Sequence, residues 1–427
     1  MSATSLMARR EQALGAGAQL FYRTPLHIVR GEGAYLFDAD GRRYVDLYNN
    51  VPCVGHANPD VVEAMARQQA TLNVNNRYLH EGVLAFAERL AALHGPQVQS
   101  VIFSCSGTEA NEVALRMARF ATGKRGIVFT DATYHGNSDL LSQLTRVREA
   151  QPANPELRAI PFPQMYRPIA TGLGEAELAD AYLERLRAAI EALERDGGGL
   201  AALIVCSIFA NEGLPDIPRG FMGRAAQMVR AAGGLVIADE VQAGYGRTGG
   251  WWGYDVTGFK PDIVVTGKPM GNGLPLAATA GSRALVDGFR AKTRYFNTFA
   301  SSPLQAAVGM AVLDVIERDG LLANVAAVGG ALKQALAERK GRWDAIGDVR
   351  GHGLFIGVEM VKDGDSKAAD PVMAAEMANR LKDRGFLTAP AGAGGNVLKI
   401  RPPLVFSQTD ADAFLAAFDA TVGELHG

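Results

Sequence analysis

The chain has 427 residues, of which 48% are hydrophobic and 21% charged, and its formal net charge is −2. This composition is that of an ordinary globular protein with a sizeable core, and it argues against a disordered or fibrous chain. The near-neutral charge and the scattered lysines and arginines exclude the basic surface that nucleic-acid binding requires.

Targeting and metal-binding signals are weak in this sequence. The N-terminal stretch MSATSLMARREQ lacks the apolar segment of a signal peptide, and no apolar window reaches the length of a membrane span. Cys53, Cys105 and Cys206 are too dispersed for a disulfide framework or a zinc site. We therefore expect a cytoplasmic protein without membrane or metal partners, whose cysteines are small core residues.

The predicted elements begin with a hairpin in residues 31–50, where apolar and polar residues alternate around the turn DADGRR. Helical spacing follows at 60–72 and 81–93. Apolar strands then alternate with helices: strands at 98–105, 126–130, 200–209, 234–239 and 262–267, and helices at 109–121, 181–196 and 220–233. Continuously apolar strands separated by helices predict a mainly parallel sheet covered by helices on both faces.

The pattern changes again after about residue 320. Residues 348–361 and 396–406 read as strands, with helices between and after them. We predict an α/β protein of two domains. Residues 60–320 form the large domain, and residues 1–59 and 321–427 together form a small α+β domain.

Polar motifs follow several of the predicted strands, at the edge of the sheet where ligands of such folds bind. Ser106, Gly107 and Thr108 separate a strand from a helix and can present backbone N–H groups and a positive dipole end to an anion. The alternative is that the Ser/Thr residues only cap the helix.

Asp239 and Lys268 also close apolar strands. A solvated lysine is the ordinary alternative for Lys268. An anion cradle, an acid and an amine at neighbouring strand ends nevertheless describe a site for pyridoxal 5′-phosphate (PLP), which needs a lysine for its Schiff base.

Nucleotide-binding motifs do not fit this chain. GYGRTG (244–249) matches the dinucleotide glycine pattern but lies beyond its strand, with an acidic segment between, rather than at a strand-to-helix turn. A P-loop sequence is missing as well.

Taken in order, the motifs resemble the class III (ω-type) aminotransferases, a family of fold type I PLP-dependent enzymes. The resemblance runs from about residue 20 to residue 420. It rests on SGTEAN (106–111), YHG (134–136), ADEVQAGYGRTG (238–249), VVTGKPMGNGLP (264–275), FNTFASSP (296–303), DVRGHGLFIG (348–357) and LKIRPPL (398–404).

The resemblance implies a role for each matching residue. Lys268 would hold PLP as a Schiff base and transfer protons, and Asp239 would keep the pyridine nitrogen protonated. Arg401 would bind a substrate carboxylate. The other implied cofactor contacts are Ser106, Gly107, Thr108, Tyr134, His135, Val241, Gln242 and Thr298 of the partner subunit, and the other implied substrate contacts are Tyr22, Asn50 and Arg77. Sharing of Thr298 implies a homodimer with active sites at the subunit interface.

One stretch departs from the family pattern. Class III enzymes usually read E-P-x-x-G-E-G-G before the acid, whereas this chain has CSIFANEG (206–213). Asn211 therefore stands where the second glutamate belongs, and Glu212 is its nearest substitute. Dual-substrate switching, which often relies on that glutamate, stays open.

Two further stretches, YNNVPCVGHANPDV (48–61) and NNRYLHEG (75–82), are similar to the ethanolamine-phosphate and phosphohydroxylysine phospho-lyases of the same family. We expect an aminotransferase that moves an amino group from a primary amine or amino acid to a keto acid or aldehyde. The alternative is a phospho-lyase that expels phosphate from an O-phosphorylated amino alcohol, with Arg77 or Arg401 contacting the phosphate. An aminomutase or racemase, a dialkylglycine-type decarboxylase, and a non-catalytic ligand-binding or nucleotide-hydrolysing α/β protein stay open as well.

Overall fold

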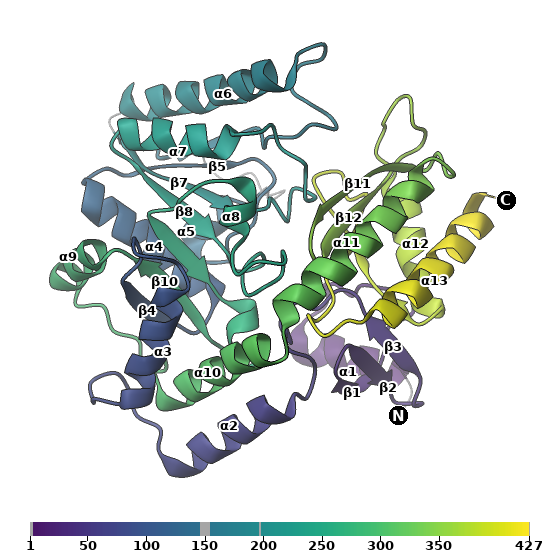
Figure 1. Cartoon of the computed structure of the whole chain (residues 1–427), viewed down its shortest axis with the longest axis horizontal. Coiled ribbons are helices and arrows are strands. Elements are labelled where there is room, and N and C mark those ends of the chain that lie inside the picture. The colour runs from purple at the N-terminus through teal and green to yellow at the C-terminus, as the bar shows by residue number, and fades with distance from the viewer. Residues whose placement is uncertain (1–2, 146–153, 196–197, 427) are drawn as a thin grey trace.

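A seven-stranded sheet organises the larger part of the molecule (Figure 1). The structure is a computed structural model that describes residues 3–145, 154–195 and 198–426. The strand order is β4-β10-β9-β8-β7-β5-β6, and β10 runs antiparallel to both of its neighbours while the other pairings are parallel. The strands are β4 (Ser100–Ser104), β5 (Gly126–Thr130), β6 (Leu157–Ile160), β7 (Leu200–Cys206), β8 (Leu235–Asp239), β9 (Ile263–Thr266) and β10 (Ala277–Gly281). The predicted mainly parallel sheet is confirmed.

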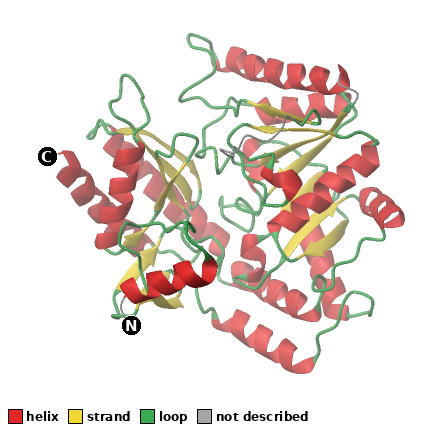
Figure 2. Ribbon diagram, turned by 180° about the vertical axis from the view of Figure 1, so that it is seen from behind, coloured by secondary structure: helices red, strands yellow, loops and turns green. Residues whose placement is uncertain are grey.

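Both faces of this sheet are covered by helices, because its strands are apolar on both sides (Figure 2). On β8, Val236 and Ala238 belong to one buried cluster and Ile237 to another. The first cluster includes residues of α3, α6, α7 and α10, and the second includes residues of α4 and α9. The helices of this part are α2 (Pro59–Thr71), α3 (Glu81–Ala92), α4 (Gly107–Thr122), α5 (Asp139–Ser142), α6 (Glu175–Arg195), α7 (Phe221–Ala231), α8 (Gly253–Thr257), α9 (Arg283–Thr293) and α10 (Pro303–Arg318).

Two smaller sheets come from both ends of the chain, and both termini lie beside them (Figure 1). One has the order β1-β2-β3-β13 and the other the order β11-β12-β15-β14. Their elements are α1 (Ala3–Leu14), β1 (Ile28–Glu32), β2 (Tyr35–Asp38), β3 (Arg43–Asp46), α11 (Leu321–Lys340), β11 (Ile346–His352), β12 (Phe355–Met360), α12 (Pro371–Asp383), β13 (Phe386–Leu387), β14 (Ala389–Ala391), β15 (Val397–Ile400) and α13 (Gln408–His426). The domain boundaries at residues 60 and 320 stay a prediction.

Several elements differ from the sequence-based expectation, and the strand expected at 396–406 is one of them, since β15 covers only Val397–Ile400. The strand expected at 200–209 ends at Cys206, because the chain turns there and Phe209 takes a positive φ of 53°. The strand expected at 348–361 is a hairpin of β11 and β12 that turns at Gly353, whose φ is 54°. Strand β10 was not predicted, because its sequence, AATAG, is poor in the β-branched and aromatic residues that are typical of strands.

Within the described residues, no single helix has the length and apolar character to cross a membrane, although α10 and α11 pass that test as a pair bent by 61°.

Candidate active site

The loops that follow β4, β5, β7, β8 and β9 meet at one edge of the large sheet. They enclose a cavity of about 120 Å³. Its lining includes every implied cofactor contact except Ser106 and Thr298, namely Gly107, Thr108, Tyr134, His135, Asp239, Val241, Gln242 and Lys268, and it adds Asn111, Gly136 and Cys206. The expectation that these strand ends converge is therefore met by the geometry.

Asp239 is buried and fixed by three hydrogen bonds. Its Oδ2 accepts from Nδ1 of His135 at 2.7 Å and from Nδ2 of Asn111 at 2.9 Å. Its Oδ1 accepts from the backbone N–H of Val241 at 3.0 Å. A carboxylate oxygen can accept two hydrogen bonds, so Oδ1 keeps capacity for one more donor.

Lys268 is the first residue of a short 3₁₀ helix, η1 (Lys268–Gly271), directly beyond β9. Burial lowers the pKa of its amine, the charge of Asp239 raises that pKa, and the charge of Arg401 lowers it. Burial is the largest of these effects, so the amine is held closer to its neutral form, which is the form that reacts with a carbonyl.

In the turn before α4 the structure shows the capping role of Ser106, whereas its contact with an anion stays a prediction. Its Oγ accepts from the backbone N–H of Glu109 at 3.2 Å, so Ser106 caps the helix. Gly107 and Thr108 face the cavity from the first turn of the same helix. A Cβ on Gly107 would come within 3.1 Å of Val241 Cγ1, so glycine permits the close approach of these two walls.

These residues fit PLP. The cavity offers an amine whose pKa is lowered by burial, a carboxylate with a free acceptor position for a pyridine N–H, and a helix N-terminus suited to a phosphate. Among the described residues, no cluster of three or more His, Cys, Asp or Glu side chains is arranged to hold a metal ion.

Arg401 approaches the same cavity from the loop after β15. Its Nε donates to the backbone oxygen of Tyr48 at 2.7 Å, its guanidinium lies 4.4 Å from the Tyr48 ring centroid, and its NH1 donates to Oε1 of Gln242. Asn50 is buried nearby and donates from Nδ2 to the backbone oxygen of Gln242 at 3.3 Å. Burial is the main influence on Arg401 and lowers its pKa.

Like Arg401 and Asn50, the remaining implied contacts lie outside the cavity lining of this chain. The Tyr22 hydroxyl donates to the backbone oxygen of Thr388 at 3.0 Å. The guanidinium of Arg77 lies 4.2 Å from the centroid of the Phe296 ring. Thr298 lines a separate cavity of about 340 Å³, together with Tyr78 and Phe299.

Two buried polar residues, one lining the cavity and one next to Arg401 on β15, were not identified as functional from the sequence. Asn111 holds Asp239 and also donates to the backbone oxygen of His135 at 2.8 Å. Lys399 is buried, and burial together with the charge of Arg401 lowers its pKa to about 7. The signals were present in SGTEAN and LKIRPPL, but a polar residue in a helix or strand is ordinarily solvated.

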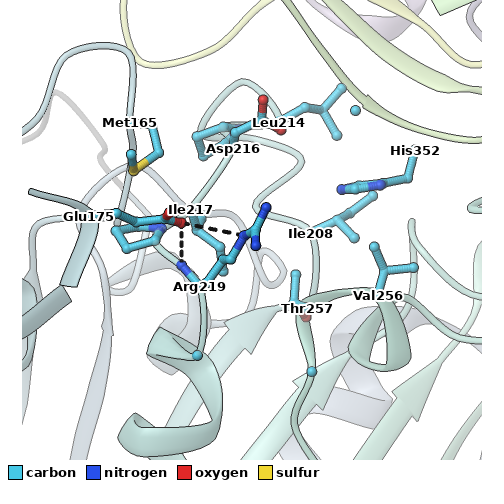
Figure 3. A pocket seen from close by; sticks show the side chains of 15 residues that line it. Met165, Glu175, Ile208, Leu214, Asp216, Ile217, Arg219, Val256, Thr257 and His352 are labelled. Carbon is cyan, nitrogen blue, oxygen red and sulfur yellow. Dashed lines mark hydrogen bonds and ion pairs between the residues drawn. The ribbon is translucent and has the colours of Figure 1, made fainter. Parts of the chain in front are cut away.

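A larger cavity of about 560 Å³ is lined in part by the segment after β7 (Figure 3). Ile208, Leu214, Asp216 and His352 are among its lining residues, and Glu175 accepts a hydrogen bond of 2.9 Å from the backbone N–H of Arg219 there. Its lining lacks the lysine and the anion cradle of the smaller cavity, so we place the chemistry in the smaller one.

The GYGRTG stretch has a structural role. Arg247 is buried, and its NH1 donates to the backbone oxygens of Leu354, at 3.2 Å, and Pro402. It therefore holds the segment after β8 against the loops next to β12 and β15.

Residues 18–422 match the Aminotransferase class-III family. The chain belongs to this family. It is 37% identical to a Drosophila melanogaster protein named Alanine--glyoxylate aminotransferase 2-like, over 98% of this chain and 87% of that protein. It is also similar to the structure of a phospholyase from Arthrobacter in complex with phosphoethanolamine, with a TM-score of 0.95 and 38% identity over 98% of this chain and 99% of that one. An aminotransferase structure from Bacillus anthracis gives a TM-score of 0.90 and 28% identity over 99% of this chain and 100% of that one.

The class III aminotransferase is thus a PLP-dependent enzyme with the fold type I architecture, as the sequence resemblance implied. The similarity to the phospho-lyase branch is supported as well.

Proposed function

We propose that this enzyme transfers the amino group of an amino acid to a keto acid or aldehyde, with the donor's carboxylate bound by Arg401. The observation that carries this proposal is the link between Arg401 and the cofactor cavity: the guanidinium is hydrogen-bonded to Gln242, which lines that cavity together with Lys268. A planar guanidinium suits a carboxylate. Alanine and glyoxylate are the first pair to test, because the Drosophila relative is named for them.

Lys268, Asp239 and Arg401 each have a distinct role in this transfer. PLP, when bound, supplies an electron sink that stabilises negative charge on the carbon bearing the amine. The amine of Lys268 takes the proton from that carbon and returns a proton at the end of the transfer. Asp239 holds a proton at the ring nitrogen, and Arg401 sets the donor's orientation.

We also propose that the active enzyme is a homodimer. Exposed apolar side chains gather near Thr298: Tyr78 is 67% exposed, Leu79 95% and Phe299 76%. Tyr78, Phe299 and Thr298 line one cavity. An exposed apolar cluster of this kind favours a protein partner, and a second copy would bring Thr298 of the partner subunit to the cofactor.

The half-reaction with a donor alone tests the proposed activity. Alanine added without an acceptor should remove the yellow colour of the holoenzyme and release pyruvate. Glyoxylate added afterwards should restore the colour and be converted to glycine. Arg401→Ala should weaken this reaction mainly through KM. A holoenzyme that keeps its colour with a panel of amino acids and amines would contradict transamination.

Phosphate elimination is the second candidate, favoured by Lys399. This buried amine lies two residues before Arg401, and the charge of Arg401 lowers the pKa of both Lys399 and Lys268. The guanidinium of Arg401, together with a Lys399 amine that can take up a proton near pH 7, suits a doubly charged phosphate ester, and the Arthrobacter phospholyase structure contains phosphoethanolamine. Release of inorganic phosphate from phosphoethanolamine, with the colour retained, would favour this reaction over transamination.

A further inference from the structure

A chain of hydrogen bonds joins Arg401 to the loop that carries Tyr134. Arg401 NH1 donates to Oε1 of Gln242. Gln242 Nε2 donates to Oδ1 of Asn211 at 3.2 Å, and Asn211 Nδ2 donates to the backbone oxygen of Tyr134 at 3.3 Å. Asn211 thus lies between two groups of the cofactor cavity, on the segment that follows β7.

The two ends of this chain fix the direction of both amides. A backbone carbonyl only accepts hydrogen bonds and a guanidinium only donates them. Asn211 must therefore turn its NH₂ group to Tyr134 and its oxygen to Gln242. Gln242 must then turn its NH₂ group to Asn211, which leaves its oxygen facing Arg401. The hydrogen-bond partners of each amide therefore determine which way its nitrogen and its oxygen point.

We propose that Asn211 is a positioning residue for substrate recognition: it holds the Gln242 amide in the orientation whose oxygen binds Arg401. Without Asn211, the Gln242 amide can rotate and present N–H groups to a guanidinium that has no acceptor to offer. The guanidinium of Arg401 would then lose its hydrogen bond to Gln242 and keep the one to the backbone oxygen of Tyr48 at 2.7 Å. A guanidinium fixed before the substrate arrives loses less freedom on binding a carboxylate.

This inference rests on the proposed role of Arg401 in carboxylate binding. Asn211 stands at the position where the family pattern has a glutamate, and it acts on Arg401 through the amide of Gln242. It also gives a reason for the pairing of Gln242 with Asn211, since the NH₂ group of Gln242 donates to the oxygen of Asn211.

The experiment measures the dissociation constant of butyrate for the holoenzyme by titration calorimetry. Butyrate is a carboxylate without an amine, so its binding does not depend on turnover. Asn211→Leu should weaken butyrate binding roughly five- to tenfold, as expected for loss of hydrogen-bond support at a charged group. Asn211→Asp retains an acceptor for Gln242 and should recover most of the affinity. With alanine as donor, Asn211→Leu should raise KM by a similar factor and leave kcat within about twofold.

A second pair of variants separates this inference from the proposed function. Arg401→Ala should abolish most of the butyrate affinity; if it does not, the carboxylate role of Arg401 is wrong and the inference falls with it. If Arg401→Ala weakens binding but Asn211→Leu does not, the proposed function stands and the role of Asn211 is overturned. Equal loss in Asn211→Leu and Asn211→Asp would overturn it too, because orientation would not be the cause.

Folding is checked in each variant by its visible absorption and thermal midpoint. Asn211→Ala replaces Asn211→Leu if the larger side chain prevents folding, and the same outcomes apply to it. Gln334→Leu serves as the control, because Gln334 is an exposed amide on α11 whose Nε2 donates to Glu338 of the same helix. It should leave butyrate binding unchanged.

Discussion

Asn111 and Asp239 are joined by a hydrogen bond of 2.9 Å between Nδ2 of the first and Oδ2 of the second. The bond connects helix α4, which also forms the anion cradle, to the end of strand β8. The carboxylate implied to face the pyridine nitrogen is therefore held by the same helix that would face the cofactor's phosphate.

Asn111→Leu should weaken the binding of PLP. The change removes a buried donor to Asp239 and to the backbone oxygen of His135, and an unsatisfied buried acceptor costs about 1–3 kcal/mol. We expect the dissociation constant of PLP to rise by roughly one order of magnitude. Equilibrium dialysis of the apoenzyme against PLP measures it. Gln334→Leu on the exposed face of α11 is the control, and an unchanged constant for Asn111→Leu would contradict the linking role of Asn111.

Lys268→Ala should remove the covalent attachment of PLP and, with it, turnover. The expected observation is a protein that binds PLP reversibly and loses its visible absorption on gel filtration, whereas the wild type keeps it after the same treatment. Activity should fall by at least about a thousandfold, because the general base is lost together with the attachment point. Lys260→Ala is a suitable control, since that lysine is exposed and paired with Asp255. Retention of a stable yellow colour in Lys268→Ala would require another lysine to carry the cofactor.

Leu79→Glu should weaken dimerisation and lower activity together. Leu79 is 95% exposed and adjacent in sequence to Tyr78, which lines one cavity with Thr298. A carboxylate at an apolar interface loses its hydration without gaining a partner, which opposes association. Light scattering after size-exclusion chromatography gives the mass, and an activity assay across protein concentration shows whether activity follows it.

Val372→Glu is the matched control for this test, because Val372 is 77% exposed but lies on α12 in the smaller part of the molecule. It should leave both mass and activity unchanged. A Leu79→Glu variant that stays dimeric would place the subunit contact elsewhere.

The positions of the main site residues were predictable because each follows a simple signal. An apolar run ends in one polar residue at Asp239 and at Lys268, and parallel strands bring their carboxyl ends to the same edge. The role of Gln242 was only partly predictable. Its place beside the cofactor cavity followed from the resemblance, but its hydrogen bond to Arg401 depends on how a loop of the smaller sheet meets the large one.

Asn111 and Lys399 show what sequence patterns leave out. Asn111 is one polar residue in a helix that reads as amphipathic, and its contact with Asp239 exists because α4 crosses the end of β8. Lys399 alternates with apolar residues on a strand, a pattern typical of a solvent-facing position. It is buried because its face of β15 packs on the segment after β7, where an added Cβ on Gly213 would come within 3.1 Å of Val397 Cγ2. The contact of Asn111 and the burial of Lys399 both result from packing between segments that are far apart in the sequence.

Lys399→Met should stabilise the protein, and the gain should depend on pH. Burial lowers the pKa of Lys399 to about 7 in the folded state, whereas the ordinary value is 10.5. Between these two values the unfolded chain binds more protons than the folded one, so the stability of the wild type rises with pH in this window. Below about pH 7 the buried amine is charged in both states and its full desolvation cost opposes folding.

The thermal midpoint of Lys399→Met should therefore exceed that of the wild type most clearly at pH 6.5, and the difference should shrink as the pH approaches 10. The expected gain at the lower pH is on the order of 2 kcal/mol, because methionine fills a similar volume without a charge. Differential scanning of both proteins at a series of pH values measures it, with Lys260→Met as the exposed control. A difference that stays constant with pH would show that Lys399 is not held near neutrality. It would then have to be paired with a charge, for which the buried carboxyl group of Glu212, whose own pKa is raised by burial, is a candidate.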